Sequence, residues 1–157
     1  MSQRLAQSSA AAQLDQRPSL TITRRLRASP PKVYAAWTNA ENLIQWFAAQ
    51  AKPGSVRADL DVRVGGRYRI SFVNQDNGEY HEVGGLYREV VPNTRLQFTW
   101  AWHSTPERVS LVTIELKPDP AGTLMIFQHA QFADQIARDN HERGWNKFFD
   151  VLEQYFA

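Results

Sequence analysis

The fold is decided by residues 123–156, which read TLMIFQHAQFADQIARDNHERGWNKFFDVLEQYF. Met125, Phe127 and His129 alternate with their neighbours, which is the period of a half-buried strand. From about residue 133 to 155 the apolar residues recur at steps of three and four, which predicts one long amphipathic helix. We therefore expect a sheet closed by a terminal helix, an arrangement that can enclose a cavity. The helix stripe predicted to face the sheet is Ile136, Asn140 or His141, Gly144 or Trp145, Phe148, Leu152 and Tyr155.

The rest of the chain predicts further strands separated by turns. Leu20 and Ile22 alternate with threonines in a first strand over residues 19–27. Ser29, as an N-cap, and the prolines after it predict a short helix, and a second short helix is expected over residues 40–47. Glycine and asparagine turns then separate alternating segments, as in antiparallel hairpins. The remaining strands are expected at about 56–62, 66–74, 79–90, 95–103, 108–118 and 122–131. The predicted class is α+β, a curved six- or seven-stranded antiparallel sheet wrapped on a long C-terminal helix.

Composition predicts one globular domain with a short tail. The 157 residues, 43% hydrophobic and 22% charged, are enough for one core, which we place over residues 19–157. Residues 1–18 are rich in Ser, Ala and Gln and lack the apolar region of a secretory signal, which predicts a disordered tail on a cytoplasmic protein. No apolar run approaches the roughly 20 residues that span a bilayer, so we expect no membrane insertion.

Several kinds of chemistry are excluded by the residue types. The chain has no cysteine and therefore no thiolate nucleophile, disulfide or Cys-based metal site. Its net charge is +2, and basic residues cluster only at residues 24–27, which argues against nucleic-acid binding. His141 and Glu142 lack the second histidine of a zinc-binding helix, and the histidines and acids near residues 79–82 and 103 do not form a ligand set. We expect no metal and no cofactor.

The order of the motifs resembles that of the START-like, or SRPBCC, superfamily, whose helix-grip fold is related to the birch pollen allergen. Within it, the terminal helix from His141 to Tyr155 is similar to that of the subfamily named after the activator of the heat-shock-protein-90 ATPase. The resemblance covers residues 19–156 and implies a cavity for a hydrophobic ligand such as a lipid, polyketide, sterol-like or aromatic metabolite. The motifs that carry it are ASPPKVYAAWT at 28–38, Trp46, VGGRY at 64–68, GLYREVVP at 85–92, RLQFTW at 95–100 and the helix itself.

The candidate ligand-binding residues lie on the predicted inward faces. They are Trp46, Phe47, Tyr68, Ile70, Phe72, Phe98, Trp100, Phe127, His129, His141, Gly144, Trp145 and Phe148. Trp46 and Phe47 are expected to gate the entrance, and His129 and His141 to face one another and hydrogen-bond the ligand. The alternative for each aromatic ring is that it packs in a filled core. The alternative for each histidine is a hydrogen bond to another protein group that stabilises the fold. Gly144 indicates either close approach of the helix to the sheet or room for a ligand.

Three hypotheses about function follow from these patterns. The first is binding of a small hydrophobic or amphipathic molecule between sheet and helix. The second is an enzyme resembling the cyclases and dehydratases of the superfamily, with His129 and His141 moving protons beside Tyr68 and Gln128. The third is an interaction module that uses exposed aromatics and the basic cluster at residues 24–27. A homodimer through Trp102 or Tyr87 is possible, whereas a chaperone partner is doubtful, because the eukaryotic co-chaperone has a separate N-terminal domain for which this chain has no room.

Overall fold

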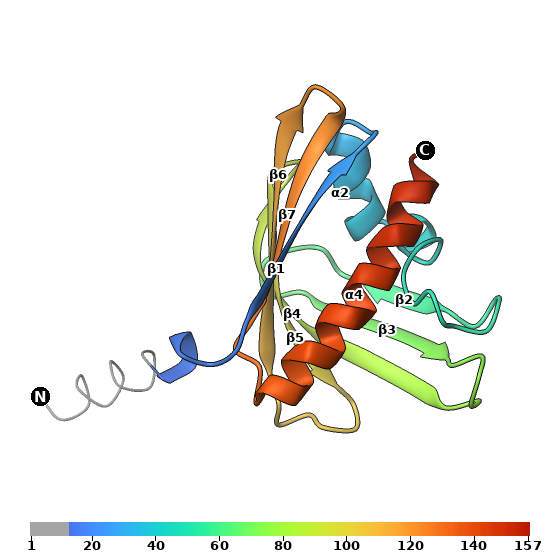
Figure 1. Cartoon of the computed structure of the whole chain (residues 1–157), viewed down its shortest axis with the longest axis vertical. Coiled ribbons are helices and arrows are strands. Elements are labelled where there is room, and N and C mark those ends of the chain that lie inside the picture. Colours follow the sequence, from blue (N-terminus) through green and yellow to red (C-terminus); the bar gives the residue numbers. More distant parts are fainter. Residues whose placement is uncertain (1–12) are drawn as a thin grey trace, which may run out of the picture.

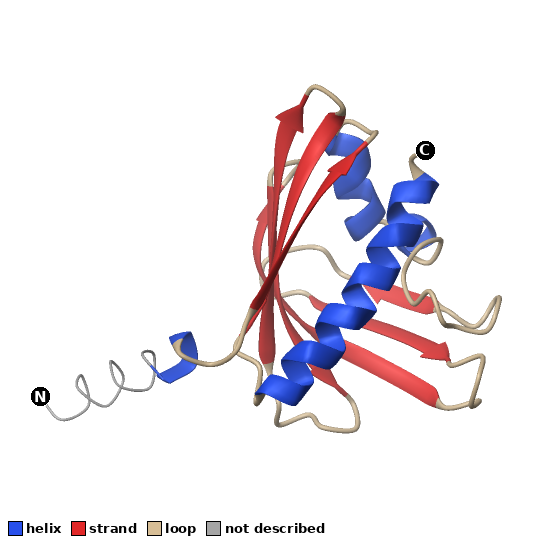
Figure 2. Ribbon diagram, in the orientation of Figure 1, coloured by secondary structure: helices blue, strands red, loops and turns tan. Residues whose placement is uncertain are grey.

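The protein is described from a computed structural model that covers residues 13–157. One seven-stranded antiparallel sheet curves around the long helix α4, and two short helices lie on the same side (Figures 1 and 2). The prediction of an α+β helix-grip fold is confirmed. The elements are β1 Leu20–Leu26, α2 Pro30–Thr38, α3 Ala40–Leu43, β2 Arg57–Leu60, β3 Arg67–Val73, β4 Tyr80–Val91, β5 Arg95–Trp102, β6 Ser110–Asp119, β7 Gly122–Ala130 and α4 Gln135–Tyr155.

The sheet order is β1-β7-β6-β5-β4-β3-β2, so the first strand pairs with the last and the remaining strands follow as hairpins. Each strand lies within about three residues of its prediction. The predicted tail falls mostly on residues outside the described part of the chain, whose first residues, 13–15, form a helical turn.

The inward faces of the strands follow the predicted alternation. Tyr68, Ile70 and Phe72 are all buried on β3, and Phe127 and His129 are completely buried on β7. Since side chains alternate between the two faces of a strand, the intervening residues point to the uncovered outer face. The inner face therefore carries the apolar and aromatic side chains beneath the helices.

Helix α4 begins at Gln135, where the side chain of Asp134 accepts a hydrogen bond from the backbone N–H of Ala137 at 2.8 Å. The predicted stripe is wrong at both ends, because Ile136 is 73% exposed and Tyr155 is 42% exposed. At 100° per residue, Ile136 lies about 140° around the helix from His141 and so faces away from the sheet. Phe149, which the stripe omitted, is completely buried one turn after Trp145.

The N-caps of the two short helices differ in their hydrogen bonding. Ser29 occupies the N-cap position of α2, but its side chain makes no capping hydrogen bond. Helix α3 is shorter than expected and ends at Leu43, and it is capped by Asn39, whose side chain accepts from the N–H of Asn42 at 3.2 Å. The Gly65-Gly66 pair makes the bend between β2 and β3, with Gly65 at φ +83°.

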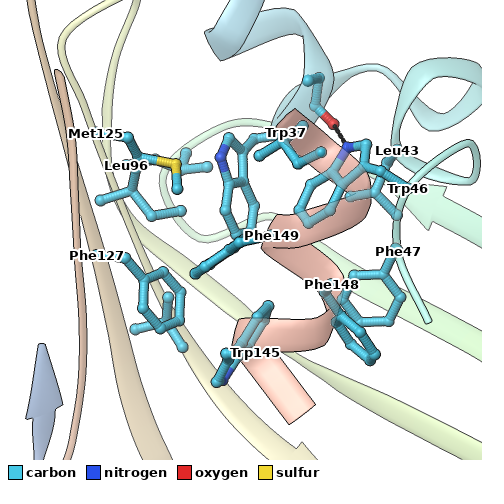
Figure 3. Packing of buried hydrophobic residues seen from close by; sticks show 14 of the residues in the cluster. Trp37, Leu43, Trp46, Phe47, Leu96, Met125, Phe127, Trp145, Phe148 and Phe149 are labelled. Atoms are coloured by element: carbon cyan, nitrogen blue, oxygen red, sulfur yellow. Dashed lines mark hydrogen bonds between the residues drawn. The ribbon is translucent and has the colours of Figure 1, made fainter. Parts of the chain in front are cut away.

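The space beneath the C-terminal half of α4 is filled with aromatic rings (Figure 3). The ring of Trp37 lies 4.7 Å from that of Trp46, edge on, and stacks on Phe127 at 6.0 Å. Phe149 packs edge-on against Phe127 at 4.9 Å and against Trp37 at 6.0 Å. Trp46 donates its indole N–H to the carbonyl of Ala36 at 3.0 Å. This half of the space is a packed core.

Arg24 joins the edge strand β1 to α4. Its guanidinium donates to Asp150 at 2.9 Å, to Glu153 at 3.1 Å and to the side chain of Asn146 at 3.0 Å, and it lies 6.0 Å from the ring of Phe149. The side chain is only 16% exposed, so these charge-assisted bonds are partly shielded from water.

Replacing Arg24 with methionine is expected to lower the free energy of unfolding by about 1–2 kcal/mol, because the apolar stem is kept while the charged hydrogen bonds are lost. Urea unfolding followed by tryptophan fluorescence measures this change. The control is Arg63→Met, since Arg63 is 76% exposed, its partner Asp61 is 53% exposed, and an ion pair in such a position should contribute well under 1 kcal/mol. Equal losses in the two variants would contradict the assignment.

Candidate ligand pocket

A pocket of about 300 Å³ opens between the first half and middle of α4 and the ends of β3, β4 and β5. Its walls are mostly aromatic: Phe72, Trp100, Trp102, Trp145 and Phe148. Its polar groups are Gln50, His81, Ser104, Asn140 and His141, and Gly144 lies in the helix wall. The volume is at the lower end of the range for small-molecule sites, about 300–1,000 Å³.

A second hollow, which shares Trp100 with this pocket, is closed. It retains about 10 Å³ and is lined by Trp37, Phe47, Tyr68, Ile70 and Phe98 among others. Such a volume holds about one water molecule at most. The side chains around it pack against one another and leave no room for a ligand.

The thirteen predicted site residues therefore fall into three groups. Phe72, Trp100, His141, Gly144, Trp145 and Phe148 line the open pocket. Phe47, Tyr68, Ile70 and Phe98 line the closed hollow, together with Trp100. Trp46, Phe127 and His129 line neither.

Trp46 and Phe47 do not occupy the gate position expected for them. They are 1% and 2% exposed, and the Phe47 ring packs against Phe148 at 4.9 Å. The turn after α3 draws both rings into the core, because Trp46 is held by its hydrogen bond to Ala36.

His129 is completely buried, and both of its ring nitrogens are engaged by protein groups. The indole N–H of Trp145 donates to Nδ1 at 3.0 Å, which places the proton of the neutral ring on Nε2. Nε2 lies 2.7 Å from the hydroxyl of Ser110 and donates to it, and that hydroxyl donates in turn to the carbonyl of Trp100 at 3.1 Å. His129 thus fixes the orientation of a pocket wall rather than facing the pocket.

His141 has the opposite tautomer. Its Nε2 accepts from the indole N–H of Trp102 at 2.9 Å and from that of Trp100 at 3.3 Å. The proton therefore lies on Nδ1, which donates to the carbonyl of Ala137 at 2.7 Å. The two histidine rings lie close together, with centroids 5.2 Å apart and ring planes at 79° to one another.

Both histidines are held neutral. Burial lowers the pKa of His129 well below its usual 6.5, and the neighbouring His141 lowers it further. Burial also lowers the pKa of His141, although its bond to Ala137 opposes this shift. Neutral rings are required here, because protonation of Nε2 on His141 would point an N–H at the N–H groups of Trp100 and Trp102.

Gly144 faces open space. A Cβ atom placed on it would meet no atom within 4 Å apart from the immediate chain and helix backbone. Of the two explanations that the sequence left open, close packing of the helix on the sheet is therefore excluded. The missing side chain leaves room at the helix wall of the pocket.

Gln50, His81, Ser104, Asn140 and Trp102 are pocket residues that the sequence-based site omitted. Trp102 had a usable signal, since it follows Phe98 and Trp100 at the two-residue period of β5. Gln50 and Ser104 lie in loops, where no periodicity indicates direction. Asn140 is an alternative to His141 on the helix stripe, and His81 lies on β4 beside Phe72, with ring centroids 5.4 Å apart.

The groups expected for the enzyme and for the interaction module are placed elsewhere. The hydroxyl of Tyr68 donates to the carbonyl of Thr99 at 2.6 Å, and burial raises its pKa well above 10. Gln128 is exposed on the outer face of the sheet.

Arg24 is bound to α4, so the basic cluster is not a continuous free surface. Tyr87 was expected at a dimer surface, but it is 3% exposed, because alternation on β4 points it into the core.

Over residues 13–157 no helix is long and apolar enough to cross a membrane. Within the same range no three His, Asp or Glu side chains gather as a metal site would require.

A helix-grip fold with an aromatic pocket beneath the terminal helix defines a START-like, or SRPBCC, domain. The family model described as Activator of Hsp90 ATPase homolog 1-like protein matches residues 27–157, and the chain belongs to this family. It has no match among curated proteins.

Solved structures of bacterial proteins share this fold. A protein from Rhizobium leguminosarum is 30% identical with a TM-score of 0.74, over 88% of this chain and 93% of that one. Protein CV1439 from Chromobacterium violaceum is 27% identical with a TM-score of 0.76, over 88% and 96%. CalU16 from Micromonospora echinospora is 25% identical with a TM-score of 0.65, over 88% and 76%.

Proposed function

We propose that the protein binds a small hydrophobic or amphipathic molecule in the pocket between α4 and β3–β5. The observation that carries this proposal is the open volume of about 300 Å³ beside Gly144, in a structure whose other half is filled with aromatic rings. The aromatic walls of this open pocket are in contact with solvent, and removing apolar surface from water is favourable. A hydrophobic ligand that fills the volume covers those walls.

The size and the walls of the pocket favour one- or two-ring aromatic metabolites over long lipids. The closed hollow that shares Trp100 with the pocket has no room for a ligand, and the indole N–H groups of Trp100, Trp102 and Trp145 are all bound to histidines. The tryptophans therefore offer their ring faces and edges to a ligand. Aromatic rings pack favourably in such surroundings, and buried apolar surface contributes about 25 cal/mol per Å².

Replacing Gly144 with leucine tests this proposal. The leucine side chain has space to enter the pocket, so we expect it to lower the affinity for 2-naphthol, used as a two-ring probe, at least tenfold while the fold is kept. The measurement is isothermal titration calorimetry, with circular dichroism and thermal unfolding as checks of folding.

The matched control is Gly144→Ala, which adds only a methyl group at the same position. This variant should keep most of the affinity and be slightly more stable, by about 0.5–1 kcal/mol, because glycine is unfavourable inside a helix. If Gly144→Leu folds and binds the probe as the wild type does, the ligand site lies elsewhere. Release of an apolar metabolite from the purified wild type, detected by native mass spectrometry, would identify the physiological ligand class.

A further inference from the structure

Gln50 is the exception among the polar groups of the pocket. Its Oε1 is buried, and no hydrogen-bond donor lies within reach of it among residues 13–157. Trp37 Nε1 is the other such side-chain atom in this part of the chain, but Trp37 lines the closed hollow. Gln50 lines the open pocket. A buried acceptor without a donor is unfavourable, so most such groups in folded proteins are paired.

The main chain holds Gln50 at this position. Its own carbonyl accepts from the N–H of Gln75 at 3.0 Å, and the N–H of Lys52 donates to the carbonyl of Val73 at 2.7 Å. Ala51 also pairs with Asn74 in an isolated bridge. These bonds tie the loop to the end of β3 and leave the side chain of Gln50 without a hydrogen bond at Oε1. The last torsion of a glutamine is broad, so a small rotation turns Oε1 toward a molecule in the pocket.

The other polar groups of the pocket are already used or exposed to water. Both nitrogens of His141 are engaged by Trp100, Trp102 and Ala137. The side-chain oxygen of Asn140 accepts from Arg143, and Ser104 is exposed. His81 Nε2 lies 3.7 Å from a carboxylate oxygen of Glu79. Gln50 therefore offers the buried acceptor that a ligand can satisfy.

We propose that Gln50 Oε1 accepts a hydrogen bond from the ligand and selects planar aromatic molecules that carry an O–H or N–H donor, such as hydroxylated or N–H-containing ring systems. This inference rests on the proposed function and assigns the polar recognition within the same pocket. The aromatic walls hold the rings, and Gln50 sets which edge of the molecule points inward. An aromatic molecule without a donor fills the same volume but leaves the acceptor unpaired.

The test compares 2-naphthol with 2-methoxynaphthalene, which has the same rings but no donor, by isothermal titration calorimetry. For the wild type we expect 2-naphthol to bind about tenfold more tightly. In Gln50→Leu the preference should disappear, through loss of affinity for 2-naphthol. Gln50→Glu keeps an acceptor oxygen and should keep the preference. Gln45→Leu is the matched control, since Gln45 is exposed on the segment before Gln50 and outside the pocket lining.

The outcomes separate the inference from the proposed function. If both probes bind equally to the wild type and to Gln50→Leu, the pocket binds aromatic molecules but the role of Gln50 is wrong. If 2-methoxynaphthalene binds more tightly to the wild type, Gln50 acts through its amide N–H₂ instead, and the inference is overturned. If neither probe binds the folded wild type, the proposed function itself fails for two-ring aromatics. Thermal unfolding of each variant establishes that it is folded.

Discussion

Lowering the pH from 7.5 to 5 is expected to reduce the free energy of unfolding, by up to about 2 kcal/mol for each of His129 and His141, because both are buried as neutral rings. In the folded protein burial lowers the pKa of both below 6.5. Below pH 6.5 the unfolded chain therefore takes up protons that the folded state excludes. The stability is complete above this pH and falls as the pH drops toward the native pKa values, at roughly 1 kcal/mol per pH unit for each histidine.

Urea unfolding between pH 7.5 and 5, followed by tryptophan fluorescence, measures this loss. The variant His129→Phe should show a shallower pH dependence, since one of the two groups is gone. It should also lose about 1–3 kcal/mol at pH 7.5, because Trp145 Nε1 is left without an acceptor. His103→Gln is the control, since the His103 side chain is 81% exposed, and it should keep the dependence of the wild type. A flat profile in the wild type would show that the rings are not held neutral.

Replacing Gly85 with alanine is expected to destabilise the fold by about 3 kcal/mol or more. A Cβ atom on Gly85 would lie 2.1 Å from the backbone oxygen of Thr99 and 2.5 Å from its hydroxyl. That hydroxyl accepts from the N–H of Leu86 at 2.8 Å, so β4 and β5 are fixed closely together here. Neither neighbour can move without breaking strand pairing, and overpacking of this kind typically costs 1–3 kcal/mol or more.

Thermal unfolding of Gly85→Ala beside Gly144→Ala checks this prediction with the same chemical change at two sites. The methyl group meets backbone atoms in the first variant and open space in the second. The two variants should therefore move in opposite directions. A loss below about 0.5 kcal/mol for Gly85→Ala would mean that β4 can shift away from β5.

The strands were predictable because the alternation of apolar and polar residues along the sequence follows the alternation of buried and exposed side chains. A half-buried strand must place every second side chain on the core, and Tyr68, Ile70 and Phe72 show this on β3. The helix stripe was predicted less well at its two ends. Ile136 lies about 180° around the helix from Trp145, whereas Tyr155 lies on the side of Phe148 but is 42% exposed at the end of α4. Phe149 belongs to the buried face instead.

The candidate site was predicted only in part, because the sequence does not show where free volume remains between the sheet and the helices. Alternation shows that Phe98 and Trp100 both point inward, but it does not show which inward ring lies beside free space. The position of the free space depends on the distance of α4 and of the α2–α3 segment from the sheet. Many packing contacts together determine that distance. Gln50 lies in a loop, where the sequence has no periodic pattern that indicates burial. Its unpaired oxygen can therefore be identified only from the structure.

The division beneath α4 into a packed half and an open half has a consequence for how such proteins diversify. Trp37, Trp46, Phe127 and Phe149 hold the fold from one side, whereas Gln50, His81, Ser104 and Asn140 line the other side without belonging to that core. Most mutations in a core destabilise, whereas partly exposed pocket residues tolerate exchange. Residue changes at these four positions should therefore cost little stability, so under the proposed function the same scaffold can acquire different ligand preferences.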